Sequence, residues 1–207
     1  MLKFIYGRAA TGKSYKIINC ISRDVIDNRD VVLLVPEQFT FESERALLSA
    51  LGDKAGTDVS VLSFTRLYDE ITRRVGGRVA NNISDADRVI IMNRAFKAIK
   101  DKLQIWGKYV NSMNFTSNII TAITEFKTAS VTPEDIEAVA DKVSSNYLKL
   151  KLQDISLIYS AYNAILGNVF LDPVDDLARL NEKLLSYRYF EGKNVYIDSF
   201  KNFTGQQ

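Results

Sequence analysis

Residues 7 to 14 constrain the fold of this chain more than any other stretch. They read Gly-Arg-Ala-Ala-Thr-Gly-Lys-Ser and fit the pattern G-x-x-x-x-G-K-[ST]. An apolar run, Leu2–Tyr6, precedes them and predicts a buried strand, and a helical pattern follows from Tyr15 to Arg23. A glycine-containing turn between a strand and a helix predicts an α/β domain with a phosphate-binding loop.

The residue types in this loop suit the binding of a nucleotide triphosphate. Gly7 lets the chain leave the strand in a tight turn, and backbone N–H groups then point at an anion. Gly12 has no side chain to block a phosphate, and the Lys13 ammonium reaches the β- and γ-phosphates. The Ser14 hydroxyl is a ligand for Mg²⁺, and the following helix N-terminus adds positive charge. The predicted ATP site consists of Gly7, Arg8, Ala9, Ala10, Thr11, Gly12, Lys13 and Ser14.

Composition excludes several classes of chemistry. The 207 residues include no histidine, so the chain cannot supply a Ser-His-Asp or Cys-His apparatus or a His-ligated metal site. Cys20 is the only cysteine, which excludes an internal disulfide and a multi-cysteine cluster. A net charge of +2 does not by itself indicate nucleic-acid binding. The sequence shows no signal peptide and no apolar run of membrane-spanning length, so we expect a cytoplasmic protein.

Three further apolar runs predict strands, at residues 30–36, 58–64 and 193–200. The first two are each followed by a helical pattern, and alternating strands and helices predict a parallel sheet in an α/β fold. Ligands of such sheets bind at the carboxyl ends of the strands. We therefore expect the loops at 7–14, 36–40 and 63–66 to share one face.

From about residue 84 to the last predicted strand, the sequence pattern is helical only. Ser84 with Asp87 resembles a capping box, and Thr132 before Pro133 marks another helix start. Apolar residues recur at spacings of three and four, for example from Leu148 through Leu152 and onward, and predict a packed helical core. We expect residues 1–83 to form the first part of a core domain, 84–187 a helical insertion, and 188–207 a return to the core sheet.

Asp198 ends the last predicted strand. A phosphate loop works with an acidic residue at the end of a neighbouring apolar strand, which holds Mg²⁺. Nucleotide-hydrolysing proteins of this class commonly place Glu next, but here Ser199 follows. The sequence therefore predicts nucleotide binding better than hydrolysis, and it assigns no catalytic residue.

Together these stretches resemble the N-terminus of the B subunit of AddAB-type ATP-dependent helicase–nucleases. The phosphate loop alone is generic, whereas the Val-Pro-Glu-Gln and Ser-Phe-Thr-Arg stretches are specific. The resemblance lies in residues 7–14, 35–48, 61–67 and 195–204.

The resemblance implies a superfamily 1-like helicase domain with a RecA-like core interrupted by a helical insertion. It implies a role in processing DNA double-strand breaks for recombinational repair, in a heterodimer with an A subunit. Members also carry a C-terminal nuclease domain with an iron–sulfur cluster, for which this chain has neither the length nor the cysteines. We therefore expect a truncated piece of a longer protein, with little activity alone. The missing Glu agrees with a subunit that recognises a recombination hotspot in single-stranded DNA more than it drives translocation.

The resemblance also implies a path for DNA. The segment Gln38, Phe39 and Thr40 matches one that lies along single-stranded DNA in related helicases, and Phe39 or Phe41 would either stack a base or pack in the core. Thr65 and Arg66 would meet backbone phosphates, although Arg66 is equally a solvated helix charge.

Two alternatives stay open. One is a small-molecule P-loop kinase with a helical lid, against which the abrupt end of the chain counts. The other is a partner-docking module in which the nucleotide site is vestigial.

Overall fold

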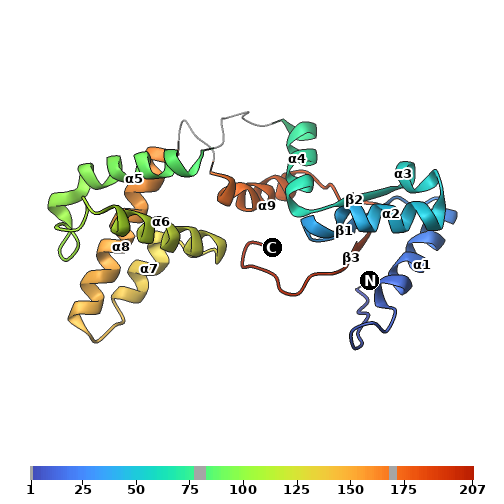
Figure 1. Cartoon of the computed structure of the whole chain (residues 1–207), viewed down its shortest axis with the longest axis horizontal. Coiled ribbons are helices and arrows are strands. Elements are labelled where there is room, and N and C mark those ends of the chain that lie inside the picture. Colours follow the sequence, from blue (N-terminus) through green and yellow to red (C-terminus); the bar gives the residue numbers. More distant parts are fainter. Residues whose placement is uncertain (1, 77–82, 168–171) are drawn as a thin grey trace. The chain divides into compact units, whose positions relative to one another are not determined.

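The strand β1 (Val31–Leu34) is the middle of a small parallel sheet. The computed structural model describes residues 2–76, 83–167 and 172–207. Among these residues, β1 pairs in parallel with β2 (Val59–Leu62) on one side and with β3 (Asn194–Ile197) on the other. All four residues of β1 are buried, as its unbroken apolar run predicts. The α/β class and the parallel sheet are thus confirmed (Figure 1).

The chain divides into two compact units. The sheet unit consists of Met1–Gly77, Leu177–Phe203 and Gln207, and the helical unit of Arg78–Asp176 and Thr204–Gln206. These boundaries differ from the expected 1–83, 84–187 and 188–207. The main reason is the last helix, α9 (Asp176–Ser186), which the sequence placed in the helical insertion but which packs with the sheet. The helices of the sheet unit are α1 (Lys13–Ile26), α2 (Thr40–Leu51), α3 (Lys54–Asp58), α4 (Phe64–Val75) and α9 (Asp176–Ser186), with the 3₁₀ turn η1 (Glu37–Phe39). The helical unit contains α5 (Asp85–Ile99), α6 (Met113–Thr128), α7 (Pro133–Ala140) and α8 (Asn146–Leu166), with the 3₁₀ turns η2 (Lys100–Lys102) and η3 (Pro173–Asp175).

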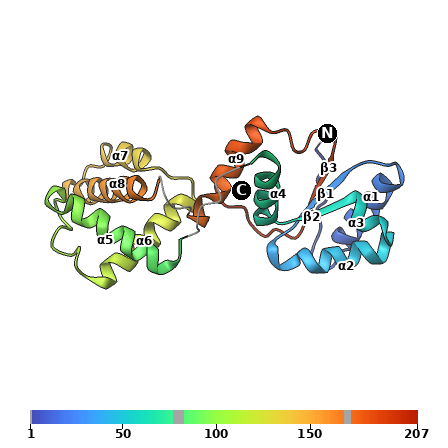
Figure 2. The same cartoon turned by 90° about the horizontal axis from the view of Figure 1, so that it is seen from above.

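Each face of the sheet has its own apolar core. On one face Val31 and Leu33 pack with Ile17, Ile21 and Val25 of α1. On the other face the alternate residues of β1 pack with α4 and α9, through the buried side chains of Val32, Leu34, Leu67, Ile71 and Leu180. Figure 2 shows the sheet between α1–α3 on one side and α4 with α9 on the other. Burial on both faces explains why β1 is apolar throughout.

The strand predicted at Leu2–Tyr6 is wrong. These residues have no strand structure, and Leu2, Phe4 and Tyr6 are 79%, 81% and 93% exposed. A strand exists only where a neighbour completes its hydrogen-bond ladder, and among the described residues none pairs with this segment. Without that strand the sheet is smaller than the expected RecA-like core.

The helical unit surrounds α8, which packs against α5 and α7. Its core includes Phe96, Ile158 and Tyr162. Both predicted helix starts are confirmed as capping boxes, Ser84 with Asp87 and Thr132 with Asp135. Across the described residues, no helix is long and apolar enough to cross a membrane.

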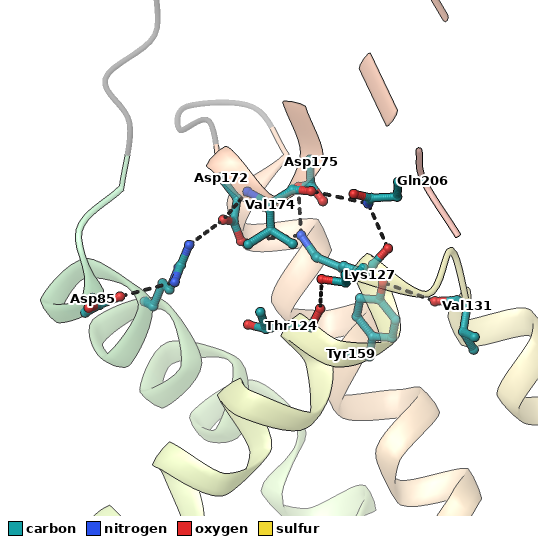
Figure 3. A network of polar contacts seen from close by, with 11 residues as sticks. Asp85, Thr124, Lys127, Val131, Tyr159, Asp172, Val174, Asp175 and Gln206 are labelled. Carbon is teal, nitrogen blue, oxygen red and sulfur yellow. Dashed lines mark hydrogen bonds and ion pairs between the residues drawn. The ribbon is translucent and has the colours of Figure 1, made fainter. Parts of the chain in front are cut away.

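A buried ionic network closes one end of the helical unit (Figure 3). The Lys127 ammonium, only 5% exposed, lies 2.7 Å from an Asp175 oxygen and 3.5 Å from an Asp172 oxygen. Asp172 also accepts a hydrogen bond from the Arg88 guanidinium at 2.8 Å. The amide of Gln206 donates to the carbonyl of Lys127 at 2.7 Å, so the segment 204–206 is held on this unit.

Candidate functional site

The predicted phosphate loop forms a tight turn directly before α1. Ala10 and Gly12 both have positive φ, 59° and 80°, and α1 begins directly afterwards at Lys13. A Cβ at Gly7 would lie 2.7 Å from the Thr11 hydroxyl oxygen, so a larger residue there would require the Thr11 side chain to move. A Cβ at Gly12 would lie in open space, and glycine suits that position because of its positive φ.

The start of α1 offers free N–H groups. Gly12 makes no side-chain cap, and the first turn holds no acidic residue. The first backbone N–H groups of an α-helix have no partner within the helix, and the helix dipole adds partial positive charge there. The loop residues Gly7–Gly12 and Ser14 are exposed. This helix start is thus exposed, and no acidic residue of its own first turn neutralises it.

Lys13 folds back over the loop. Its ammonium donates to the carbonyls of Gly7 at 3.0 Å and Arg8 at 2.7 Å, and the Thr11 hydroxyl donates to the Arg8 carbonyl at 2.8 Å. These bonds hold the ammonium on the carbonyls of the loop that precedes α1.

Asp198 lies at the carboxyl end of β3. Its backbone N–H donates to the Leu34 carbonyl at 3.0 Å, which extends the β1–β3 ladder by one residue, and Ser199 then turns the chain with φ of 66°. No hydrogen bond joins Asp198 to Ser14 among the described residues. A hydroxyl and a carboxylate are oxygen ligands of the kind Mg²⁺ takes together with phosphates and water, so the donor set fits that ion. No group of three or more acidic or cysteine side chains in the described part of the chain forms a ready metal site.

A cavity of about 420 Å³ opens at the carboxyl edge of the sheet. The segments after β1, β2 and β3 build its wall, as the rule for parallel sheets predicts. No residue of the loop at 7–14 contributes to it. The wall consists of Val35, Pro36, Glu37, Gln38, Phe39, Ser63, Phe64, Thr65, Ser199, Phe200, Lys201, Asn202 and Gln207.

The structure brings together some of the residues predicted to bind DNA. Gln38, Phe39 and Thr65 all line the cavity. Thr40 does not, because it is buried and its hydroxyl donates to the Glu37 carbonyl at 2.9 Å. Phe39 also packs against the apolar core beside α1, so one edge of its ring is committed to packing.

Arg66 is held by two carboxylates. Its guanidinium lies 2.7 Å from a Glu44 oxygen and 3.8 Å from a Glu37 oxygen. The Ser63 hydroxyl accepts the Arg66 backbone N–H at 3.1 Å and caps α4. The arginine is half-exposed, so a phosphate can compete for it, but only against these two partners.

Sequence reasoning missed the third wall of the cavity, the segment after β3. It carries Lys201, Asn202 and an aromatic ledge, in which Phe200 lies edge-on to Phe64 at 5.5 Å and stacks on Phe203 at 5.0 Å. The rule that selected the loops after β1 and β2 applies equally to β3, so the signal was present.

Comparison with known sequences finds relatives along the whole chain. The family described as "ADDB, N-terminal" matches residues 4–207. A Clostridium tetani (strain Massachusetts / E88) protein, named as the B subunit of an ATP-dependent helicase/deoxyribonuclease, is 37% identical over 100% of this chain and 18% of that protein. Proteins of the same name from Clostridium botulinum (strain Loch Maree / Type A3) and Caldanaerobacter subterraneus subsp. tengcongensis are 34% and 36% identical, with the same coverage. The chain thus spans about a fifth of the length of these relatives.

Proposed function

This chain belongs to the ADDB N-terminal family, and on that premise we propose that it is the nucleotide-binding, helicase-like portion of a DNA-processing helicase–nuclease subunit. Its relatives are named as subunits of an ATP-dependent helicase/deoxyribonuclease, which supports a DNA substrate and a partner subunit. The finer proposal is a RecA-like core that binds ATP and contacts single-stranded DNA. Its parent protein would act on DNA duplex ends in the cytoplasm, together with an A subunit and its own iron–sulfur nuclease domain.

One observation carries the ATP proposal. The helix α1 begins without a side-chain cap at Lys13, whose ammonium donates to the carbonyls of Gly7 and Arg8 in the preceding loop. A triphosphate would replace these neutral carbonyl acceptors with phosphate oxygens, which carry a negative charge opposite to that of the Lys13 ammonium. The Ser14 hydroxyl and the Asp198 carboxylate would hold Mg²⁺, which neutralises phosphate charge when bound.

The cavity at the carboxyl edge of the sheet supports the DNA proposal. Its wall combines an amide (Gln38), a hydroxyl (Thr65), an ammonium (Lys201) and aromatic rings, which is the mixture that single strands meet in sequence-tolerant sites. Arg66 follows the wall residue Thr65 on α4. Its guanidinium would exchange its carboxylate partners, Glu44 and Glu37, for a DNA phosphate. Recognition of a hotspot sequence would then reside in the polar groups of the wall.

Equilibrium binding of a fluorescent ATP analogue with Mg²⁺ tests the nucleotide site. Lys13→Ala removes a charge-assisted contact and should weaken binding roughly 10- to 100-fold without altering the circular dichroism spectrum. Lys16→Ala, which removes an exposed lysine from the same helix, is the matched control and should bind like wild type. Equal affinity in Lys13→Ala and wild type would reject the site and favour the docking-module alternative.

Binding of a labelled single-stranded oligonucleotide tests the DNA face. Lys201→Ala should weaken binding and lower the slope of log affinity against log salt by the equivalent of about one phosphate contact. Lys54→Ala, which removes an exposed lysine away from the cavity, should change neither the affinity nor the slope. Salt-independent binding, or equal losses in both variants, would contradict the proposed face.

A further inference from the structure

A buried carboxylate joins the far end of α1 to β3. Asp24 is only 9% exposed, and one of its oxygens accepts hydrogen bonds from the Asn194 amide at 2.7 Å and the Tyr196 hydroxyl at 2.6 Å. The other oxygen accepts from the Arg29 guanidinium at 3.1 Å. Three donors from two segments therefore converge on this side chain, and we call these four residues the Asp24 clamp.

The clamp stands on the same strand face as Asp198. Side chains alternate along a strand, and in β3 Asn194 and Tyr196 are turned to α1 while Val195 and Ile197 are more exposed. The backbone bond from Asp198 to Leu34 continues the ladder past the end of the strand. The alternation therefore brings Asp198 to the α1 side, in line with the donors of the clamp.

The helix α1 and the strand β3 both extend from the clamp toward the proposed nucleotide site. Along α1, Ser14 lies ten residues before Asp24, a distance of about 15 Å at the helical rise. Along β3, Asp198 lies four residues after Asn194, about 13 Å in an extended strand. A 10° swing of α1 about the clamp would move Ser14 by roughly 2.6 Å, whereas Mg²⁺ needs oxygen ligands at about 2.0–2.1 Å in a near-ideal octahedron.

Apolar packing does not fix this swing by itself. Ile17, Ile21 and Val25 bury α1 against the sheet, but hydrophobic contacts are non-directional. Hydrogen bonds to a buried carboxylate are directional, and removing one leaves a buried polar group unpaired.

We infer that Asp24 is a positioning residue, which holds α1 on β3 so that Ser14 and Asp198 reach one Mg²⁺ ion. The inference rests on the proposed ATP function and deepens it, because it says what sets the metal geometry. Mutation of a residue that orients a metal ligand without binding the metal itself typically lowers metal affinity about 10- to 100-fold.

The test compares affinity for the fluorescent ATP analogue in Mg²⁺ with that in EDTA. Tyr196→Phe removes one clamp bond at nearly constant volume. Asp24→Asn removes the negative charge and replaces one of the two acceptor oxygens with an NH₂ group, which cannot accept. We expect both variants to keep the wild-type affinity in EDTA but to lose about tenfold of the gain that Mg²⁺ gives. Asp27→Asn, which removes the exposed second partner of Arg29, should keep the full gain.

The outcomes separate this inference from the proposed function. If the wild type binds no nucleotide in either condition, the proposed ATP site falls and the clamp's role falls with it. If the wild type gains affinity from Mg²⁺ and both clamp variants gain equally, only the inference is overturned. Equal losses with and without Mg²⁺ would show a clamp that serves the fold alone, and would also overturn it. Circular dichroism melts set a temperature at which the variants are folded, and Tyr196→Phe carries the test if Asp24→Asn does not fold.

Discussion

Replacing Asp154 with alanine should destabilise the helical unit strongly. This carboxylate lies within α8 and is 1% exposed. It accepts the backbone N–H groups of Gln104, Ile105 and Trp106 at 2.9, 2.8 and 3.0 Å. Alanine removes the acceptor of all three groups. Water can replace it at the exposed Gln104, but less readily at the half-buried Ile105 and Trp106.

The expected loss follows from the two shielded donors. A hydrogen bond to a charged group contributes about 1.5–3 kcal/mol, so two of them correspond to a loss of roughly 3–6 kcal/mol in the free energy of unfolding. Domains of this size have only about 5–15 kcal/mol in total. Since 1 kcal/mol shifts the melting temperature of a small domain by about 4–8 °C, Asp154→Ala should melt more than about 12 °C below wild type.

Urea unfolding followed by tryptophan fluorescence measures this loss. Trp106 is the only tryptophan in the sequence and lies in the helical unit, so its emission reports on this unit. Asp154→Asn keeps one acceptor oxygen and should fall between alanine and wild type. Asp141→Ala is the control, because Asp141 is 67% exposed in its pair with Lys149, and such a pair contributes at most about 1 kcal/mol.

The result that would refute this reasoning is a wild-type unfolding free energy in Asp154→Ala. It would mean that water satisfies the three N–H groups and that the carboxylate does not hold the segment after η2 on α8.

Three further predictions concern the same unit and use the same fluorescence assay. Thr132→Ala removes the N-cap of α7 and should cost about 1 kcal/mol; no change in the urea midpoint would contradict the cap. Hydrogen bonds from the backbone N–H and hydroxyl of Thr132 lower the pKa of Asp135, so this aspartate stabilises the folded state above its unfolded pKa of 3.8. That contribution should be lost as pH falls through the lower pKa of the folded state. The difference in unfolding free energy between wild type and Asp135→Asn should therefore shrink between pH 6 and pH 3. A constant difference would reject the linkage. Lys127→Met removes the buried ammonium from Asp172 and Asp175 and should cost about 3 kcal/mol, since removing one partner from a buried ion pair is strongly destabilising; an equally stable variant would contradict this.

Local patterns in the sequence predicted local structure well. The capping boxes at Ser84 and Thr132 depend on residues three positions apart, and the unbroken apolar run of β1 depends on burial on both faces. Leu2–Tyr6 is as apolar as a strand should be, yet it forms none, because apolar character predicts burial and not a pairing partner. The inward position expected of Leu148 is likewise wrong, since this side chain is exposed at the start of α8.

The polar residues that hold the molecule together could not be found in this way. Asp154 meets its donors 48 to 50 residues away, and Asp24 meets Asn194 and Tyr196 across 170 and 172 residues. Each of these aspartates lies in a helix, where a single sequence presents it as an ordinary solvated charge. Only the fold shows that they are buried. The sequence also predicted that three loops would share one face. The loops after β1 and β2 do line one cavity, but no residue of the predicted phosphate loop lines it.

The outer edge of β3 has a consequence for how this polypeptide behaves in concentrated solution. Within the described residues no strand pairs with that edge, and the exposed Val195 and Ile197 add apolar surface beside it. An open strand edge with apolar side chains is a template for pairing between molecules. Self-association should therefore rise with protein concentration, and a lysine at position 195 should suppress it by placing a charge where a second strand would dock.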